Sequence, residues 1–594
     1  MVNFNKQQQQ AIEFHNGACA VIAGAGSGKS TVLLNRIKTL VEVHNVKESD
    51  ILAISFTKNT ADELNKKLRK MGLSKVNTGT FHAVCRSILN SEGLLIGKSL
   101  IPPYQKENAI SSRDKKIDLD DILSFISYQK NYNVSSEDKF VVRDSKYTED
   151  ELRDYYRKYE QFKNKNNYFD HDDTLVDCLK VLVENKGKHT FKYILVDEHQ
   201  DSNLVQNNLI KELCPEGNVF CVFDYRQAIY SFRGGNTEYC MNFTNDYEGA
   251  TVINLDYNYR SPDNVVSNAN TFIKNYYGSY EHYSDSIAND KTNGDVKVKS
   301  FMSQSDEGEK IGEEIEKLVA SGENLNDIAV LFRNNAQSSD IEFQLKSKGI
   351  EYFNAKGGSF FKWKEIAAII SYLRLISNPH DDVAFENVFR FRNFPLVFFS
   401  NKLYENIKTF SGTNNYSYFE TLQSPSMKYQ KGWERDRAND FCSMIEKLRT
   451  QNDKGVPVSK LIDNVVKAFR IEEYIHNNYS NEEEIQTRLE SIEKLKSFIK
   501  HNNLDQFIAF TYSNTNTSKP KKECVKLMSV HSSKGLEYKH VFLIGVEDGK
   551  FPHKRSDLLE EARLFYVAVT RPTRNLHISQ IGEDNLFVKE YLNK

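Results

Sequence analysis

Cysteine is scarce in this sequence, and the spacings that build metal sites or disulfide frameworks are missing. Eight cysteines are spread over 594 residues, and no two of them form a Cys-x-x-Cys pair. A zinc site, an iron–sulfur site and a disulfide-stapled fold are therefore disfavoured. We expect scattered buried thiols in a protein of the reducing cytoplasm.

Long hydrophobic runs are missing as well. No apolar stretch approaches the roughly 18 residues that a membrane-spanning helix needs, and the N-terminal residues lack the apolar core of a signal peptide. We therefore expect no membrane partner.

An excess of charge of one sign is the third absence. The 79 basic and 81 acidic residues leave a formal net charge of −2, which excludes a strongly basic histone-like protein and an acidic disordered one. A nucleic-acid partner remains compatible with this balance, because a groove can be locally basic on a protein that is neutral overall.

The length and the order of the apolar segments predict an α/β protein of several domains. Hydrophobic residues make up 39% and charged residues 27%, as is ordinary for a globular chain. Short apolar runs predict strands at residues 20–23, 51–56, 193–196, 219–223, 328–332, 525–528 and 540–544. Helical periodicity follows several of these runs, which indicates parallel sheets covered by helices on both faces.

Two long stretches interrupt this alternation and predict helical insertions. Residues 91–188 are polar with apolar positions at helical spacing, and within them Thr148 and Glu151 have the spacing of a capping box. The second stretch covers residues 378–512. Each insertion is expected to interrupt one α/β lobe.

A glycine-rich segment between a predicted strand and a predicted helix indicates a phosphate site. It consists of Ala23, Gly24, Ala25, Gly26, Ser27, Gly28, Lys29, Ser30 and Thr31. Glycines let backbone N–H groups curl around phosphate oxygens, and the start of the following helix adds a favourable dipole. In a P-loop, Lys29 would reach the β- and γ-phosphates and the Ser30 hydroxyl would hold Mg²⁺. A glycine-rich turn with a chance lysine is the alternative interpretation.

Two acidic residues end another of the predicted strands. Asp197 and Glu198 directly follow the apolar residues 193–196. Functional sites in open α/β sheets form at the carboxyl ends of strands. Asp197 could therefore hold Mg²⁺ through water, and Glu198 could polarise an attacking water, while a plain turn is the alternative.

The motifs, taken in chain order, resemble those of superfamily 1 DNA helicases of the UvrD/Rep/PcrA type. The resemblance covers nearly the whole chain, and the family tolerates alanine at the position of Ala23. Its segments are residues 4–12, 23–31, 55–61, 79–82, 197–202, 224–234, 258–261, 328–338, 357–361, 531–538 and 566–571. The chain departs from the usual pattern at His199, Phe223 and Pro572, where phenylalanine, glycine and alanine are common.

The resemblance implies an α/β fold with two RecA-like P-loop lobes, each built from a parallel sheet flanked by helices and each carrying a mainly helical insertion. Residues 1–90 and 189–262 would form the first, ATP-binding lobe, and residues 91–188 its insertion. Residues 263–377 and 519–594 would form the second lobe, and residues 378–518 its insertion.

The resemblance also implies ATP and Mg²⁺ as the cofactors. The residues expected to bind the nucleotide are Gln8, Ala23, Gly24, Ala25, Gly26, Ser27, Gly28, Lys29, Ser30, Thr31, Tyr259, Arg260, Glu537 and Arg571. Among them, Gln8 would read adenine, Tyr259 would stack on it, and Glu537 would lie near the ribose. Ser30 and Asp197 would hold the metal.

A smaller set of residues would carry out the hydrolysis. Its members by resemblance are Lys29, Asp197, Glu198, Gln227, Arg260 and Arg571. Gln227 would sense the γ-phosphate. Arg260 and Arg571 would stabilise charge on the transferring phosphoryl group, an effect that is typically worth about 10³–10⁵ in rate.

A third set would contact single-stranded DNA. Its members by resemblance are Phe56, Thr57, Lys58, His82, Tyr230, Phe232, Arg333 and Asn335. Stacking of a base on an aromatic ring is worth about 1–3 kcal/mol, and an average duplex step costs about 1.4 kcal/mol. A few stacked bases could therefore hold a separated strand, although any one of these rings could instead belong to a core.

The short stretch after Arg571 bears on strand separation. Its 23 residues predict one strand at residues 575–581 and one helix at residues 586–592. We expect no room there for the family's long wedge hairpin or for a C-terminal nuclease domain. Unwinding by the isolated protein is therefore less secure than ATP hydrolysis and translocation.

Three functions remain open on the sequence. The first is an ATP-dependent translocase and helicase that acts on single-stranded DNA and on junctions of single- and double-stranded DNA, with 3′-to-5′ movement implied by the resemblance. The second is an ATP-gated DNA-binding motor subunit that serves a nuclease or another protein partner, for example in antiphage defence. The third, a P-loop ATPase that acts on proteins, would leave the DNA-facing aromatic residues unexplained.

Overall fold

The computed structural model describes residues 4–110, 118–143, 145–230, 234–354, 360–429, 431–479, 482–499, 503–515, 523–554, 556–582 and 585–593. The chain forms two compact units. The first comprises residues 1–311, 327–333 and 529–594, and the second comprises residues 312–326 and 334–528. Each unit is described by itself.

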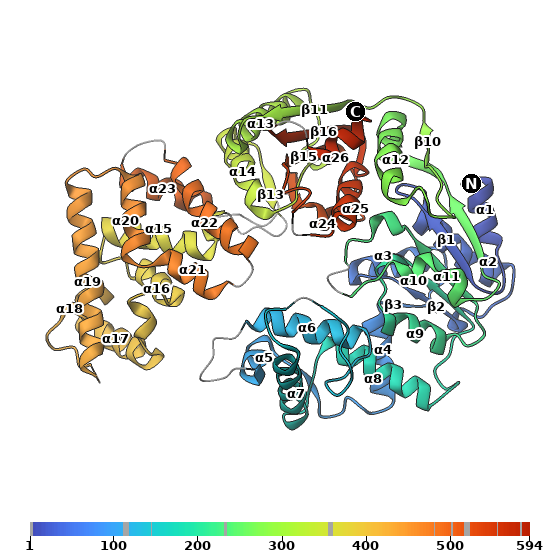
Figure 1. Cartoon of the computed structure of the whole chain (residues 1–594), viewed down its shortest axis with the longest axis horizontal. Helices are drawn as coiled ribbons and strands as arrows, with labels where there is room; N and C mark the ends of the chain where they lie inside the picture. Colours follow the sequence, from blue (N-terminus) through green and yellow to red (C-terminus); the bar gives the residue numbers. More distant parts are fainter. Residues whose placement is uncertain are drawn as a thin grey trace. The chain divides into compact units, whose positions relative to one another are not determined.

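The first unit begins with a six-stranded parallel sheet in the order β3-β2-β6-β7-β1-β8. Figure 1 labels its strands β1, β2 and β3. Its elements are α1 (Lys6–Glu13), β1 (Cys19–Ala23), α2 (Lys29–Glu42), β2 (Ile51–Ile54), α3 (Lys58–Lys70), β3 (Asn77–Gly79), α4 (Phe81–Ser91), β6 (Tyr193–Val196), α9 (Leu204–Leu213), β7 (Val219–Phe223), α10 (Glu238–Met241), α11 (Phe243–Asp246) and β8 (Thr251–Leu255). Every residue of β1, β2, β6 and β7 is buried. A parallel sheet covered on both faces requires such continuous apolar strands.

A mainly helical segment lies between β3 and β6 in the sequence. It contains β4 (Ser99–Leu100), α5 (Pro103–Ile110), α6 (Leu119–Asn131), α7 (Glu149–Lys165), β5 (Tyr168–Phe169) and α8 (His171–Glu184). The predicted capping box is confirmed, because Thr148 and Glu151 exchange bonds at the start of α7. Tyr155, Tyr156 and Tyr159 of α7 pack with Ile122 and Ile126 of α6 in a separate core.

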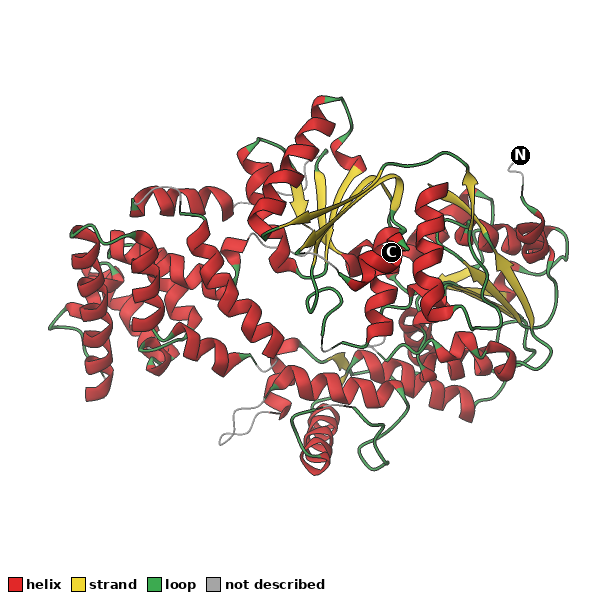
Figure 2. Cartoon of the chain, turned by 45° about the horizontal axis from the view of Figure 1, so that its top comes forward, coloured by secondary structure: helices red, strands yellow, loops and turns green. Residues whose placement is uncertain are grey.

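The remainder of the first unit holds a second set of parallel strands, in the order β11-β16-β15-β12. The elements of this part of the first unit are β9 (Tyr257–Pro262), α12 (Asp263–Tyr277), β10 (Ile287–Asp290), β11 (Val296–Phe301), β12 (Ile328–Phe332), α24 (Val530–Ser533), β15 (Tyr538–Val546), α25 (Leu558–Val569), β16 (Pro572–Ile581) and α26 (Leu586–Leu592). Strands β9 and β10 pair with each other in a separate two-stranded sheet. Helix α13 (Gln304–Ala320) continues along the chain from the first unit into the second. The strands of the first unit, yellow in Figure 2, are flanked by helices, drawn in red.

The second unit is mostly helical. Its elements are α14 (Ser338–Ser347), β13 (Tyr352–Asn354), α15 (Lys364–Ser377), α16 (Asp382–Phe391), α17 (Asn401–Asn414), α18 (Tyr418–Gln423), α19 (Gly432–Asp453), α20 (Val458–Ala468), α21 (Ile471–Asn478), α22 (Glu482–Ser497), α23 (Leu504–Thr515) and β14 (Val525–Ser529). Helix α15 is buried nearly all round, as expected for the central helix of a bundle, and it contacts α16, α19, α20 and α23 (Figure 1). The ring of its Tyr372 stacks on the ring of Phe469, with the two ring centroids 3.8 Å apart.

The predicted fold class is confirmed, since parallel sheets flanked by helices recur on both sides of a helical insertion. Strands β6, β7 and β12 have the predicted bounds, whereas β2 ends at Ile54 instead of residue 56. All eight cysteines are free and buried, as expected. None of the helices in the described ranges is both long and apolar enough to cross a membrane.

Candidate nucleotide and DNA sites

The glycine-rich segment forms a loop between β1, which ends at Ala23, and α2, which begins at Lys29. Gly26 has a φ of +68°, and a Cβ there would lie 2.6 Å from the Cβ of Arg260, so only glycine fits. The backbone N–H of Tyr259 donates to the Gly26 carbonyl at 2.9 Å. The loop therefore lies directly against β9.

The Lys29 ammonium is folded back onto the loop. Its Nζ donates to the Ala23 carbonyl at 2.7 Å and, at 3.5 Å, to the Gly24 carbonyl. Burial lowers the pKa of Lys29, and the nearby carboxylates of Glu198, Asp224 and Asp197 only partly oppose this shift. Among the described residues, this half-buried ammonium donates only to carbonyl oxygens, so it is suited to an incoming anion.

The remaining residues of the loop differ in exposure. Ala23, Gly24, Ala25 and Ser27 are buried, Gly28 and Thr31 are half-buried, and Ser30 is exposed at the start of α2. The Ser27 hydroxyl donates to the Gly24 carbonyl at 2.9 Å, which closes the loop on itself. Ser30 is therefore the hydroxyl of this segment that is open to a bound cation.

The acidic pair follows β6, two strands away from β1 in the sheet order. Glu198 has a φ of +55°, a strained conformation for a residue other than glycine, and such strain is common at functional sites. Burial and the charge of Glu198 raise the pKa of Asp197 to about 7. Burial opposes ionisation of Glu198 as well, but the ammonium groups of Lys29 and Lys534 hold its pKa below the usual value. Glu198 is thus the carboxylate that stays ionised.

Arg571 lies between α25 and β16 and is 1% exposed. Its guanidinium donates to the Gln227 Oε1 at 2.8 Å, to the Val567 carbonyl at 2.8 Å and to the Leu536 carbonyl at 3.2 Å. Burial, followed by the charge of Arg260, lowers the pKa of Arg571 to about 9. Among the residues with described positions, none offers Arg571 a carboxylate within ion-pair distance.

Arg260 lies on β9 beside the loop. Its Nε donates to the Glu537 Oε2 at 2.8 Å, and its Nη1 donates to the Thr570 carbonyl at 3.4 Å. Arg260 and Arg571 therefore approach the same region from two segments that are far apart in the sequence. Glu537, which the family resemblance places near the ribose, forms an ion pair with an arginine in this structure.

The predicted adenine end is built from α1 and β9. The Gln8 Nε2 donates to the Ser27 carbonyl at 3.0 Å. This bond holds the buried amide against the glycine-rich loop of residues 24–28, called the phosphate loop below. The Asn5 Nδ2 donates to the Tyr259 hydroxyl at 2.9 Å, and the Tyr259 ring is 46% exposed. An exposed ring fixed at its hydroxyl is available for stacking on a base.

These residues fit a nucleoside triphosphate with a divalent cation. The loop presents the cation of Lys29, Arg260 lies against the loop at Gly26, and Arg571 is bonded to Gln227. Burial, followed by the charge of Glu198, raises the pKa of Asp197, and a divalent cation would offset both effects. Hydroxyl and carboxylate oxygens, as in Ser30 and Asp197, are the ligands that Mg²⁺ prefers.

Lys534 joins this site, although the sequence-based set does not contain it. Its Nζ lies 2.5 Å from the Asp201 Oδ2 and 3.9 Å from the Glu198 Oε2. The same ammonium lies 5.0 Å from the centre of the Tyr230 ring. The only sequence signal was its place three residues before Glu537 in the same motif.

The aromatic residues predicted to face DNA are brought together in part. The rings of Phe56 and Tyr230 are stacked, with centroids 5.4 Å apart, and both are half-buried. The Tyr230 hydroxyl donates to the His531 carbonyl at 3.5 Å. Phe232 lies outside the described residues, as do residues 357–359.

A cavity of about 490 Å³ opens beside Phe56. Its lining residues are Phe56, Phe81, His82, Ser124, Ser127, Tyr128, Asn131, Asp172, Leu175, Asp201, Asn203 and Gln206. Burial lowers the pKa of His82 to about 4, and His171 adds to the shift, so His82 is neutral at pH 7. Residues of α6 and α8 that line this cavity have no signal in the sequence, because neither helix carries a motif.

The other residues predicted to contact DNA are Thr57, Lys58, Arg333 and Asn335. Thr57 caps α3 by accepting a bond from the Thr60 N–H at 3.2 Å, and Lys58 is exposed. Arg333 forms an ion pair with the buried Glu561, with a closest distance of 2.8 Å. Asn335 is exposed in the second unit.

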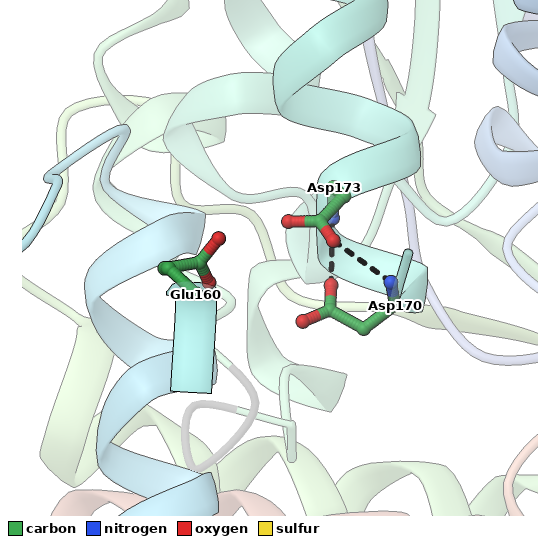
Figure 3. A group of neighbouring side chains, drawn as sticks. All are labelled: Glu160, Asp170 and Asp173. Carbon is green, nitrogen blue, oxygen red and sulfur yellow. Dashed lines mark hydrogen bonds between the residues drawn. The ribbon is translucent and has the colours of Figure 1, made fainter. Parts of the chain in front are cut away.

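A cluster of three carboxylates in the first unit resembles a metal site at first sight (Figure 3). Glu160 comes from α7, while Asp170 and Asp173 form the N-terminal capping box of α8. Lys130 and Lys163 fill the space, because each ammonium lies within 3.0 Å of all three carboxylates. The cluster is therefore a buried ion-pair network that joins α6, α7 and α8.

Two family models match the chain. The UvrD/REP helicase N-terminal domain matches residues 4–248, and the UvrD-like helicase C-terminal domain matches residues 253–583. The first match ends just before β8 and the second begins within it, so the boundary lies at the start of the last strand of the first sheet.

Similar proteins include the ATP-dependent DNA helicase PcrA of Bacillus subtilis (strain 168), which is 31% identical over 636 residues covering 99% of this chain and 84% of that protein. PcrA of Staphylococcus aureus (strain NCTC 8325 / PS 47) is 28% identical over 625 residues, covering 98% of this chain and 84% of that protein. Both matches extend through the two helical insertions. Together with the phosphate loop, the acidic pair and the converging arginines, the matches show that the chain belongs to the UvrD/Rep family of helicases.

Proposed function

We propose that this family member is an ATP-hydrolysing DNA helicase that moves along single-stranded DNA in the 3′-to-5′ direction and acts on junctions of single- and double-stranded DNA. The observation that carries the proposal is the span of residues 227–230. Gln227 is bonded to the buried Arg571, and Tyr230, three residues later, is stacked on Phe56. One short segment thus touches the nucleotide residues and the DNA-facing rings.

We assign the first lobe to residues 1–90 and 189–262 and its insertion to residues 91–188. The second lobe then comprises residues 263–377 and 519–594, with residues 378–518 as its insertion. The bond from Arg571 of the second lobe to Gln227 of the first supports this division, since a triphosphate on the Lys29 loop would then contact groups from both lobes. Closure on the nucleotide would move Gln227, and with it Tyr230.

The residues of the chain have distinct tasks in this proposal. Glu198 stays ionised and can accept a hydrogen bond from the attacking water. Lys29, Arg260 and Arg571 place positive charge where the transferring phosphoryl group spreads negative charge over its oxygens. Mg²⁺ bound by Ser30 and Asp197 would neutralise further phosphate charge. Gln227 reports the occupancy of the site to Tyr230.

The test measures ATP turnover by the purified full chain with and without single-stranded DNA, followed by strand separation on duplexes with a 3′ or a 5′ tail. We expect turnover that DNA stimulates and unwinding of the 3′-tailed duplex only. Turnover that DNA leaves unchanged would refute the DNA motor. Stimulated turnover without strand separation would instead favour a motor subunit that requires a nuclease or another protein partner.

A further inference from the structure

Arg226 is a buried arginine that the proposed catalytic set does not use. It follows β7 directly before Gln227 and is 3% exposed. Its Nε donates to the Asp224 Oδ1 at 2.7 Å, and its Nη1 donates to the Ser284 carbonyl at 3.3 Å. The centres of the Tyr225 and Tyr566 rings lie 5.5 and 5.7 Å from the guanidinium carbon.

Asp224, the ion partner of Arg226, is fully buried. A buried carboxylate without a cation is costly. Burial raises the pKa of Asp224, but the Arg226 guanidinium, followed by Lys29, outweighs this effect and holds the pKa below its usual value. Arg226 therefore keeps Asp224 ionised and supplies the hydrogen bond to its Oδ1.

The ionised Asp224 sets the orientation of the Gln227 amide. The Gln227 Nε2 donates to the Asp224 Oδ2 at 2.6 Å, which turns Oε1 towards the Arg571 Nη2 at 2.8 Å. A carboxylate can only accept, so the reverse orientation of the amide would lose both bonds. The order Arg226–Asp224–Gln227–Arg571 is thus a chain of directed, charge-assisted bonds.

Arg226 also lies against the phosphate loop. A Cβ added to Gly24 would lie 2.9 Å from the Arg226 Nη2 and 3.0 Å from the Ser286 Oγ. The absence of a side chain at Gly24 is what lets the guanidinium approach the loop. Arg226 thereby touches both the loop and the partner of Gln227.

We propose that Arg226 is a positioning residue for ATP hydrolysis, which fixes the amide of Gln227 through Asp224 and so presents Arg571 in one orientation. The proposal rests on the proposed ATPase function of this site. Arg226 itself contacts no reacting atom. Its effect on hydrolysis therefore passes through Gln227. A positioning role requires Gln227 to be present, whereas a general contribution to folding does not.

The test is a double-mutant cycle in the full chain with saturating single-stranded DNA. Arg226→Met should lower kcat by about 10- to 100-fold, the range found when the orienting partner of a functional group is removed. The KM for ATP should change less than threefold. In a Gln227→Ala background, Arg226→Met should change kcat by less than about twofold, since residues that act as one unit are not additive.

A matched control is Arg36→Met. Arg36 is a second buried arginine of the first unit, bonded to the His15 carbonyl at 2.8 Å and placed over the Phe220 ring. It should leave kcat within about twofold of wild type. A comparable loss of kcat in Arg36→Met would assign the effect of Arg226→Met to general destabilisation and overturn the proposal.

Two further variants keep the test decisive if Arg226→Met folds poorly. Arg226→Lys retains the charge, and its smaller loss of kcat should likewise vanish in the Gln227→Ala background. Asp224→Asn combined with Arg226→Met retains an acceptor for Gln227 without a lone buried charge, and it should recover part of kcat. Equal fold-losses with and without Gln227 would overturn the positioning role, whereas absence of ATP turnover in the wild type would overturn the proposed function.

Discussion

Two polar clusters of the first unit contain lysines whose pKa values shift in opposite directions. Lys130 lies among Glu160, Asp170 and Asp173, and the charges of these carboxylates outweigh burial and raise its pKa well above the usual value. Lys29 lies on the phosphate loop, and burial lowers its pKa. The two sites differ in their partners, because Lys130 has three carboxylates in contact and Lys29 has carbonyl oxygens.

The difference in ion partners distinguishes a cluster that stabilises the fold from a site suited to bind a ligand. In the first, each ammonium is already paired, so the charges serve to join α6, α7 and α8. In the second, Lys29 and Arg571 carry positive charge that no described carboxylate pairs with at short range. A site of this kind is completed by an anionic ligand. Substitutions should therefore affect folding in the first cluster and turnover in the second.

The largest expected effect is that of Arg571→Gln. Because this guanidinium is directed at the γ-phosphate in the proposed function, kcat should fall by about 10³–10⁵. The free energy of unfolding should change far less than for the paired cluster, since no ion pair is broken. Steady-state turnover and chemical denaturation of the same preparation measure both quantities. Strong destabilisation with retained turnover would reverse the comparison.

Lys163→Met should have the next largest effect, on stability. It removes one of the two ammonium groups from three carboxylates, so the free energy of unfolding should fall by about 3–5 kcal/mol. Turnover of the folded fraction should stay close to wild type. The matched control is Lys158→Met on the exposed face of the same helix, which should change stability by about 0.5 kcal/mol or less. Equal effects of the two variants would remove the structural role of the cluster.

Lys29→Met should lower kcat by about 10²–10³, because it removes one pre-placed cation from the transferring phosphoryl group. Its thermal unfolding should not shift downwards, since the variant also removes a buried charge without an ion partner. A thermal melt together with an ATPase assay checks this. Near-normal turnover would refute the assignment of the phosphate loop.

The smallest expected effect is that of Tyr230→Ala. Loss of one stacking ring should weaken binding of single-stranded DNA by about 1–3 kcal/mol. Fluorescence anisotropy with a labelled oligonucleotide measures the change, and Tyr416→Ala, an exposed tyrosine of the second unit, is the control. Unchanged affinity of Tyr230→Ala would place the DNA track elsewhere.

The sequence predicted the strands well because a parallel sheet leaves a simple signal. Strands β6 and β7 are continuous apolar runs, each followed directly by an aspartate, and their bounds agree with the prediction. The phosphate loop, the acidic pair and the arginines could be placed because their motifs are local. Their convergence could be expected from the family resemblance, but their bonds could not.

The contacts that sequence reasoning missed are long-range ones without a local pattern. Lys534 reaches Asp201 across more than half of the chain, and Tyr128 and Asp172 enter the cavity from helices that carry no motif. Arg226 was overlooked because its role depends on the burial of Asp224, which a single sequence does not reveal. Phe232 remains a prediction outside the described residues, and the DNA roles of Arg333 and Asn335 remain predictions as well.

The pairing of Arg260 with Glu537 has a consequence for the end of each catalytic cycle. Because an exposed carboxylate lies 2.8 Å from this guanidinium, the arginine has a partner to return to once inorganic phosphate departs. In the proposed function, Glu537 would therefore compete with the nucleotide for Arg260. Such an exchange would favour release of the spent nucleotide and leave the site ready for the next one.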